Sequence, residues 1–179
     1  MLAGPPGFGY AAGVTSRPRI YMASPLGFSE AGRHFYDGVL VPFVHGLGYE
    51  VLDPWSLTDL RKIAAVRALA YGPERRDAWR QLDVEIGATN RAAIDRSDGI
   101  VAVLDGVDVD SGTAAEIGYA FGRGKLIIGY RGDFRLSADN EGSTVNLQVE
   151  YFIRESGGTI VERYQDLAPA LAPLRGGSA

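Results

Sequence analysis

Residues 99–130 read GIVAVLDGVDVDSGTAAEIGYAFGRGKLIIGY and contain the clearest structural pattern of the chain. This stretch begins and ends with continuous apolar runs rich in Val and Ile, 99–104 and 125–130, and a helical pattern at 113–122 lies between them. Runs without polar alternation are typical of strands that are buried on both faces of a parallel sheet. The stretch therefore predicts a strand, a helix and a second strand parallel to the first.

The same alternation continues outward in both directions. Further strands are predicted at 19–23, 49–52 and 158–161. Helices are predicted from Ser29 with a bend at Pro42, twice between 59 and 98 with the second over 77–98, over 144–156, and from Tyr164 onward. We expect a flavodoxin-like α/β fold, a doubly wound five-stranded parallel sheet in a three-layer α/β/α arrangement. Residues 18–179 are predicted to form a single domain and residues 1–17, rich in Gly, Ala and Pro, a flexible extension.

Composition excludes several classes of function. The formal net charge is −4 and the basic residues are scattered, so no basic stripe indicates nucleic acid as a partner. The absence of cysteine excludes disulfides, thiolate metal sites and a cysteine nucleophile. No segment reaches the ~18 apolar residues of a membrane span, and the start lacks the basic and apolar regions of a secretory signal. We therefore expect a cytoplasmic protein that binds neither membrane nor nucleic acid.

In open parallel sheets, ligands bind outside the carboxyl ends of the strands. This rule predicts a site made by four loops, 24–28, 53–55, 105–112 and 131–135. The third loop is acidic and leads to Glu116. It does not fit a calcium loop of the EF-hand type, because Val107 and Val109 occupy the third and fifth positions, where oxygen ligands are needed. No metal and no cofactor are expected.

Two interpretations of this loop stay open on local sequence. Thr113 and Glu116 have the spacing of a capping box, in which Glu116 only completes the helix start. Alternatively, Asp110 and Glu116 are two carboxylates at one crevice, which suits glycosidic chemistry with a nucleophile and a proton-transferring acid. Ser111 and Gly112 are small enough for a sugar to approach the backbone closely.

Three stretches together, IYMASPLGF (20–28), residues 98–135 and VNLQVEYFI (145–153), resemble the nucleoside 2-deoxyribosyltransferase family. The resemblance extends from residue 19 to about 160, and the element DSGTAAEIGYA (110–120) is its most specific part. It implies a flavodoxin-like homo-oligomer, dimer-based and extending to a tetramer or hexamer. Such enzymes move 2-deoxyribose between nucleobases through a covalent glycosyl-glutamate.

The resemblance also implies roles for individual residues. Glu116 resembles the nucleophile, Asp110 the acid that relays the proton of the base, and Tyr21 the tyrosine that holds the nucleophile, although a core aromatic is the simpler interpretation of Tyr21. Asn146 resembles an asparagine donated to the sugar by a neighbouring subunit, and otherwise is a helix cap. Asn90 stands where some members carry a base-binding aspartate.

Other residues of the expected site are less defined. Phe28 and Trp55 lie in predicted loops at the edge of the sheet, where an aromatic ring can stack on a base or pack in the protein. Asp133 and Arg135 either approach the base or pair with each other. The resemblance implies a closure of the site by C-terminal aromatic residues of an adjacent subunit, but the sequence ends APLRGGSA, so we expect this element to be missing or replaced.

The predicted function is transfer of 2-deoxyribose between purine, and also pyrimidine, 2′-deoxynucleosides and free nucleobases by a ping-pong mechanism, with slow hydrolysis as a side reaction. The alternative is a nucleoside 5′-monophosphate N-glycosidase, which needs a phosphate pocket after the first strand. Only Arg33 lies near that loop in the sequence. A non-enzymatic receiver domain is a remote alternative, because Met22–Pro25 replaces the acidic pair that receivers carry there.

Overall fold

The computed structural model describes residues 17–175. Its centre is a five-stranded, all-parallel sheet in the order β2-β1-β3-β4-β5. The strands are β1 (Arg19–Ala23), β2 (Glu50–Leu52), β3 (Gly99–Val103), β4 (Leu126–Tyr130) and β5 (Ile160–Val161). The flavodoxin-like α/β class predicted from the apolar runs is confirmed. The predicted extension lies outside the described residues, apart from Arg17.

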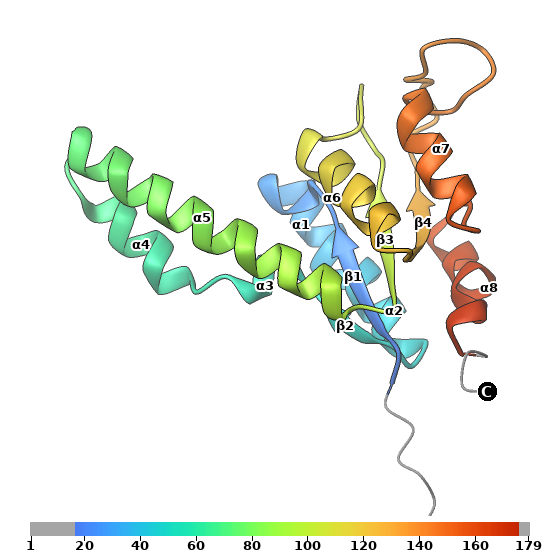
Figure 1. Cartoon of the computed structure of the whole chain (residues 1–179), viewed down its shortest axis with the longest axis horizontal. Coiled ribbons are helices and arrows are strands. Elements are labelled where there is room, and N and C mark those ends of the chain that lie inside the picture. Colours follow the sequence, from blue (N-terminus) through green and yellow to red (C-terminus); the bar gives the residue numbers. More distant parts are fainter. Residues whose placement is uncertain (1–16, 176–179) are drawn as a thin grey trace, which may run out of the picture.

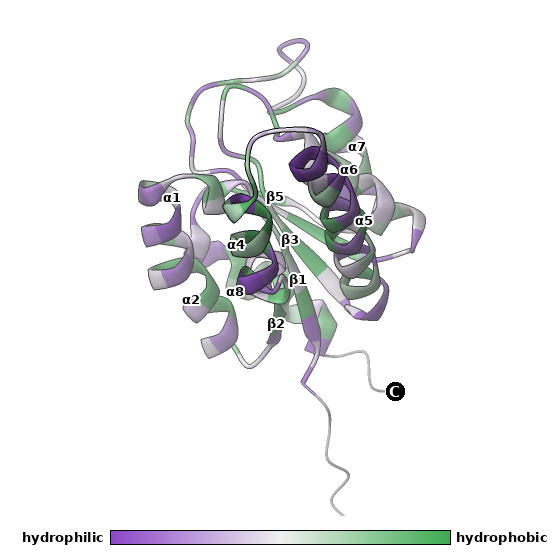
Figure 2. Ribbon diagram, turned by 90° about the vertical axis from the view of Figure 1, so that its left-hand side faces the viewer, coloured by the Kyte–Doolittle hydropathy of each residue, from purple (hydrophilic) through white to green (hydrophobic). Residues whose placement is uncertain are grey.

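Two hydrophobic clusters cover the two faces of the sheet, because alternate residues of a strand point to opposite faces. Tyr21, Ile100 and Ile127 face one layer of helices, α5 (Pro73–Arg96), α6 (Ser111–Gly122) and α7 (Leu147–Glu155). Ile20 and Val101 face the other layer, α1 (Glu30–Phe35), α2 (Val41–Gly46) and α8 (Leu167–Leu171). Figure 2 shows the sheet between these layers, so the three-layer arrangement holds.

The helix after β1 is widened in its middle. Ser29 accepts a hydrogen bond from Gly32 N and begins α1, as the sequence predicts. A π-helical turn, Tyr36–Leu40, connects α1 to α2, and Val41 N donates to Tyr36 O in place of the usual partner. Pro42 follows at once. Since proline has no N–H for the helical ladder, the wide turn accommodates the irregularity that the sequence predicts there as a bend.

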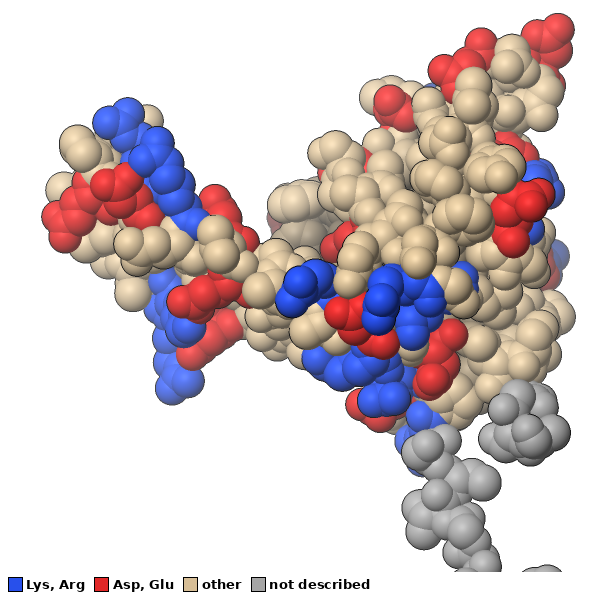
Figure 3. All heavy atoms as spheres, viewed as in Figure 1, with Lys and Arg blue, Asp and Glu red and all other residues tan. Residues whose placement is uncertain are grey.

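Helices α4 (Leu60–Ala68) and α5 form a hairpin that projects from the body (Figure 1). A short helix, α3 (Pro54–Leu57), precedes it. Val66 of α4 and Leu82 of α5 are buried, and acidic and basic side chains are mixed over the visible surface of the hairpin (Figure 3). The two helices predicted between 59 and 98 are thus confirmed, although α5 begins at Pro73, a favoured first helical residue, rather than at 77.

Two predicted helix starts are corrected by the caps that the structure shows. Asp110, not Thr113, begins α6, because its Oδ2 accepts from Thr113 N at 3.0 Å. The capping-box interpretation is therefore wrong, and Glu116 lies in the second turn instead of closing the first. Asn146 begins α7 by accepting from Gln148 N and Val149 N, which moves that start from 144 to Leu147. Among the described residues, no helix has the length and apolar character needed to cross a bilayer.

Candidate active site

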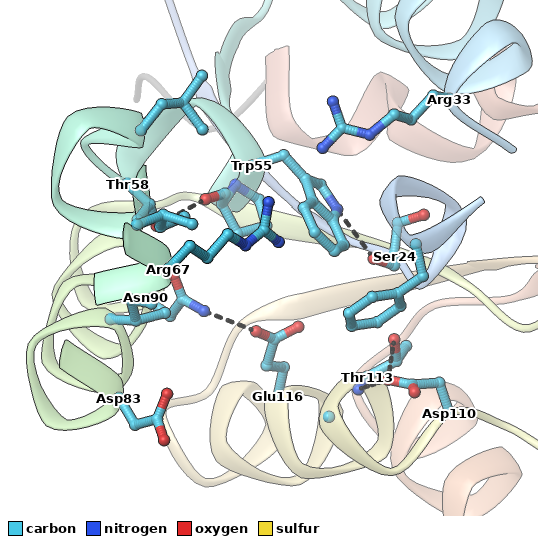
Figure 4. A pocket seen from close by; sticks show the side chains of 16 residues that line it. Ser24, Arg33, Trp55, Thr58, Arg67, Asp83, Asn90, Asp110, Thr113 and Glu116 are labelled. Atoms are coloured by element: carbon cyan, nitrogen blue, oxygen red, sulfur yellow. Dashed lines mark hydrogen bonds between the residues drawn. The ribbon is translucent and has the colours of Figure 1, made fainter. Parts of the chain in front are cut away.

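A cavity of about 490 Å³ opens beyond the carboxyl ends of β1 and β3, a size typical of small-molecule sites. The body supplies the loop after β1, α3 and the first turns of α6, and the α4–α5 hairpin supplies the opposite side (Figure 4). Its lining comprises Ser24, Phe28, Arg33, Pro54, Trp55, Thr58, Leu60, Ile63, Arg67, Asp83, Ile86, Asn90, Asp110, Gly112, Thr113 and Glu116.

Glu116 is half-buried in this cavity and is held by Tyr21. The Tyr21 phenol, on a fully buried residue of β1, donates a hydrogen bond of 2.6 Å to Glu116 Oε1. Burial raises the pKa of Glu116, the hydrogen bond from Tyr21 opposes that shift, and the nearby charge of Asp110 adds to it. Burial and the Glu116 charge raise the pKa of Tyr21 far above its usual value, so the phenol stays protonated and remains a donor.

Asn90 and Asp110 lie on different sides of Glu116 (Figure 4). Asn90 Nδ2 donates a long hydrogen bond of 3.5 Å to Glu116 Oε1, and Asn90 Oδ1 is buried without a hydrogen-bond partner among the described residues. Asp110 is fixed by its role as the cap of α6. The helix start therefore holds a second carboxylate within electrostatic range of the first.

One wall of the cavity is aromatic. The Trp55 indole donates from Nε1 to Ser24 O at 3.1 Å, and the Phe28 ring meets it edge to face with centroids 4.8 Å apart. The indole lies so close to Gly27 that a Cβ there would be 2.1 Å from Trp55 Cε2. Arg33 donates from Nε to Gly27 O at 2.8 Å and lies 5.7 Å from the Trp55 ring centroid. Phe28 is 76 % exposed and so presents its ring to whatever enters.

The structure gathers some of the predicted site residues and not others. Phe28, Asn90, Asp110, Gly112 and Glu116 line the cavity, and Tyr21 contacts it through Glu116. Four predicted residues do not line it: Ser111, Asp133, Arg135 and Asn146.

The fourth predicted loop, 131–135, does not line the cavity, and Arg131 anchors it to the neighbouring backbone. Arg131 is 2 % exposed and donates to the carbonyl oxygens of Leu104, Gly106 and Arg135. Asp133 and Arg135 form an ion pair with each other, which lowers the pKa of Asp133 well below its usual range. Of the two interpretations left open by the sequence, the structure favours the ion pair.

Sequence reasoning missed the side of the cavity that the hairpin supplies. Leu60, Ile63 and Arg67 lie on one face of α4, and Asp83, Ile86 and Asn90 lie on the facing side of α5, at spacings of three to four residues. This spacing is present in the sequence, but it is typical of any amphipathic helix and so does not by itself indicate a binding surface; of these residues, the sequence predicts only Asn90 as part of the site.

Fold and site together define a flavodoxin-like α/β protein with a half-buried glutamate, hydrogen-bonded by a tyrosine, at the carboxyl edge of its sheet. The sequence model of the nucleoside 2-deoxyribosyltransferase family matches residues 20–148, and the chain belongs to this family. No curated protein sequence matches the chain.

Solved structures share the fold. A conserved protein from Enterococcus faecalis V583 is 24 % identical, with a TM-score of 0.61, over 88 % of this chain and 99 % of that one. The 2-deoxyribosyltransferase from Bacillus psychrosaccharolyticus is 19 % identical, with a TM-score of 0.61, over 87 % and 95 %. A 2-desoxiribosyltransferase from Leishmania mexicana is 23 % identical, with a TM-score of 0.58, over 90 % and 99 %.

Proposed function

We propose that the protein transfers 2-deoxyribose between nucleobases through a covalent intermediate on Glu116. The observation that carries this proposal is the Tyr21–Glu116 pair in the cavity. A half-buried carboxylate, fixed by a phenol and facing open space, has the placement that a nucleophile needs. A carboxylate that merely caps a helix would instead lie at the first turn, where Asp110 already serves.

The proposed reaction has two half-reactions. A Glu116 oxygen attacks C1′ of the deoxynucleoside, the C1′–N bond breaks, and its electron pair leaves with the base, which receives a proton through Asp110. A ring nitrogen of a second base then attacks C1′, loses its proton to Asp110 and releases Glu116 as a carboxylate. Water attacking the same ester would yield 2-deoxyribose.

A 5′-monophosphate N-glycosidase is the alternative. In favour of it, Arg33 and Arg67 both line the cavity. Against it, Asp83, Asp110 and Glu116 line the same cavity, and a phosphate there would be repelled by their charges. Arg33 is also partly committed, since its Nε donates to Gly27 O.

The deciding experiment mixes the protein with deoxyadenosine and a second free base. We expect the deoxynucleoside of the second base, and a protein mass raised by one 2-deoxyribosyl group when the second base is omitted. The Glu116→Gln variant should show neither. Release of deoxyribose alone, or activity only on the monophosphate, would contradict transfer and support the alternative.

We also propose that Asn146 completes the site of a second copy in a homo-oligomer. Asn146 lies at the start of α7, outside the cavity of its own chain. Leu147 and Tyr151, one turn apart beside it, are 51 % and 52 % exposed, and Tyr151 continues into an aromatic cluster with Phe121 and Phe152. An exposed apolar surface next to the asparagine that is proposed to bind sugar is what a shared site requires.

A further inference from the structure

The side of the cavity that the hairpin supplies has both apolar and charged side chains. Leu60, Ile63 and Ile86 are apolar, whereas Arg67 on α4 and Asp83 on α5 are charged. Within residues 17–175, the Arg67 guanidinium makes no hydrogen bond and no ion pair, although its side chain extends into the cavity toward Trp55 (Figure 4). It is therefore a free donor group that faces the space where a substrate would lie.

The proposed function, on which this inference rests, fixes how a deoxynucleoside lies in the cavity. Its C1′ must be at Glu116, and the small residues Gly112 and Thr113 at the start of α6 leave room for the sugar. The ring nitrogen bonded to C1′ stays next to Glu116 and Asp110. The far edge of the base then extends toward the hairpin, where Ile63 and Ile86 suit the faces of an aromatic ring.

A guanidinium is a planar fork of donors that accepts no hydrogen bond. It is matched by two acceptors side by side, such as O6 and N7 of a 6-oxopurine. Adenine presents an amino group in place of O6, so its donor would meet the donors of Arg67. We propose that Arg67 is a specificity-determining residue that favours 2′-deoxynucleosides of guanine and hypoxanthine over deoxyadenosine.

Arg33, the other cation of the lining, has a different position. Its Nε donates to Gly27 O and its guanidinium lies over Trp55, so it supports the aromatic wall. Arg67 is better suited to a neutral base edge than to a phosphate. A phosphate near Arg67 would share the cavity with Asp83, Asp110 and Glu116, whose negative charges would repel it.

The test compares kcat/KM for deoxyinosine, deoxyguanosine and deoxyadenosine, each with the same acceptor base, in the wild type and in Arg67→Met and Arg67→Lys. We expect Arg67→Met to lower the values for the two 6-oxopurine nucleosides by about 5- to 150-fold, the effect of losing one bidentate contact. Deoxyadenosine should change by less than about 3-fold, within the effect of an ordinary surface substitution. Arg67→Lys should restore little of the loss, because an ammonium group cannot donate two parallel hydrogen bonds in the planar geometry of a guanidinium.

Arg80→Met is the matched control. Arg80 belongs to the same hairpin, does not line the cavity and pairs with Asp77 at 2.6 Å, so its removal should leave all three values unchanged. An equal loss for all three nucleosides in Arg67→Met, or no loss for any, would overturn the inference. The inference would also be overturned if Arg67→Met lowered activity only on the corresponding 5′-monophosphates, because Arg67 would then bind a phosphate.

Binding of free hypoxanthine and adenine, measured by calorimetry, separates this inference from the proposed function. We expect tighter binding of hypoxanthine by the wild type, and loss of that preference in Arg67→Met. If the wild type shows the preference without any transfer, the proposed function fails while the base site stands. If transfer occurs but the wild type binds adenine as tightly as hypoxanthine, the inference about Arg67 is wrong and the proposed function still stands.

Discussion

Tyr21 and Glu116 are 95 positions apart in the chain, yet the phenol of one donates a 2.6 Å hydrogen bond to the carboxylate of the other. Tyr21 comes from β1 and Glu116 from α6, so the pair forms only when the sheet and the helix layer pack. This hydrogen bond lowers the pKa of Glu116 against the larger effect of burial. It helps to keep the proposed nucleophile ionised and also fixes its direction.

Tyr21→Phe removes this hydrogen bond and keeps the ring. The pKa of Glu116 should rise further, and because attack needs the carboxylate, the acid limb of kcat/KM against pH should move to higher pH. The rate at the optimum should fall about 10-fold or more, since a hydrogen bond to a charged group is lost. An unchanged pH profile in a well-folded variant would remove Tyr21 from the machinery and leave it a core aromatic.

Glu116→Gln should stabilise the protein at neutral pH. The pKa of Glu116 is raised in the folded state, so its ionisation costs stability once the pH exceeds the folded-state value. Glutamine has no such cost. The variant should therefore melt at a higher temperature than the wild type at pH 7, and the gap should close as the pH falls toward the ordinary glutamate value. Thermal melts of both proteins between pH 4 and pH 8 measure this difference in melting temperature. A difference that widens toward acid pH would contradict a raised pKa for Glu116.

Substitution can separate the observed role of Asp110 as a helix cap from its proposed role in proton transfer. Asp110→Asn keeps a good helix cap, so stability should change little, whereas Asp110→Ala should cost about 0.5–2 kcal/mol. Both should lower transfer by about 10²- to 10⁴-fold if the carboxylate relays the proton. In Asp110→Asn, loss of the charge lowers the pKa of Glu116, so the acid limb should move to lower pH. Near wild-type transfer by Asp110→Asn would reduce Asp110 to a cap.

Gly27→Ala tests the aromatic wall. The new Cβ would lie 2.1 Å from Trp55 Cε2, so the indole must move, at a cost of about 1–3 kcal/mol and with a higher KM. Gly87→Ala in α5 is the control, because the new Cβ would have no other atom within 4 Å. It should stabilise the helix by about 0.5–1 kcal/mol. Denaturant unfolding measures the change in stability of both variants, and steady-state kinetics measure their KM. An unaltered KM in Gly27→Ala would mean that Trp55 does not shape the binding space.

The proposed shared site predicts complementation between two inactive variants. Glu116→Gln and Asn146→Ala should each lose transfer alone, because one lacks the proposed nucleophile and the other the proposed sugar contact. After mixing and subunit exchange, a hybrid dimer has one site with both residues intact, so about a quarter of all sites should recover. Activity assays before and after exchange measure this. Mixtures that stay inactive despite exchange would place Asn146 in its own subunit's site or in none.

Much of the fold was predictable because its signals are local. Continuous apolar runs such as 99–104 need two buried faces, which only the middle of a parallel sheet provides. Ser29 and Gly157 were sufficient to indicate where helices begin and end. The sequence pattern predicts the start of α6 too late and that of α7 too early, because Thr113 resembles a cap and the choice among nearby polar residues depends on which side chain reaches a free N–H.

The parallel sheet, the loop that carries Asp110 and Glu116, and the family resemblance can all be derived from the sequence, since they depend on residues that are close along the chain. Folding brings together groups that no local pattern connects. It places Tyr21 against Glu116, pairs Asp133 with Arg135, and adds Arg67 and Asp83 to the cavity. Helical periodicity indicates which residues share a face, whereas the packing of the hairpin against the body determines what that face contacts.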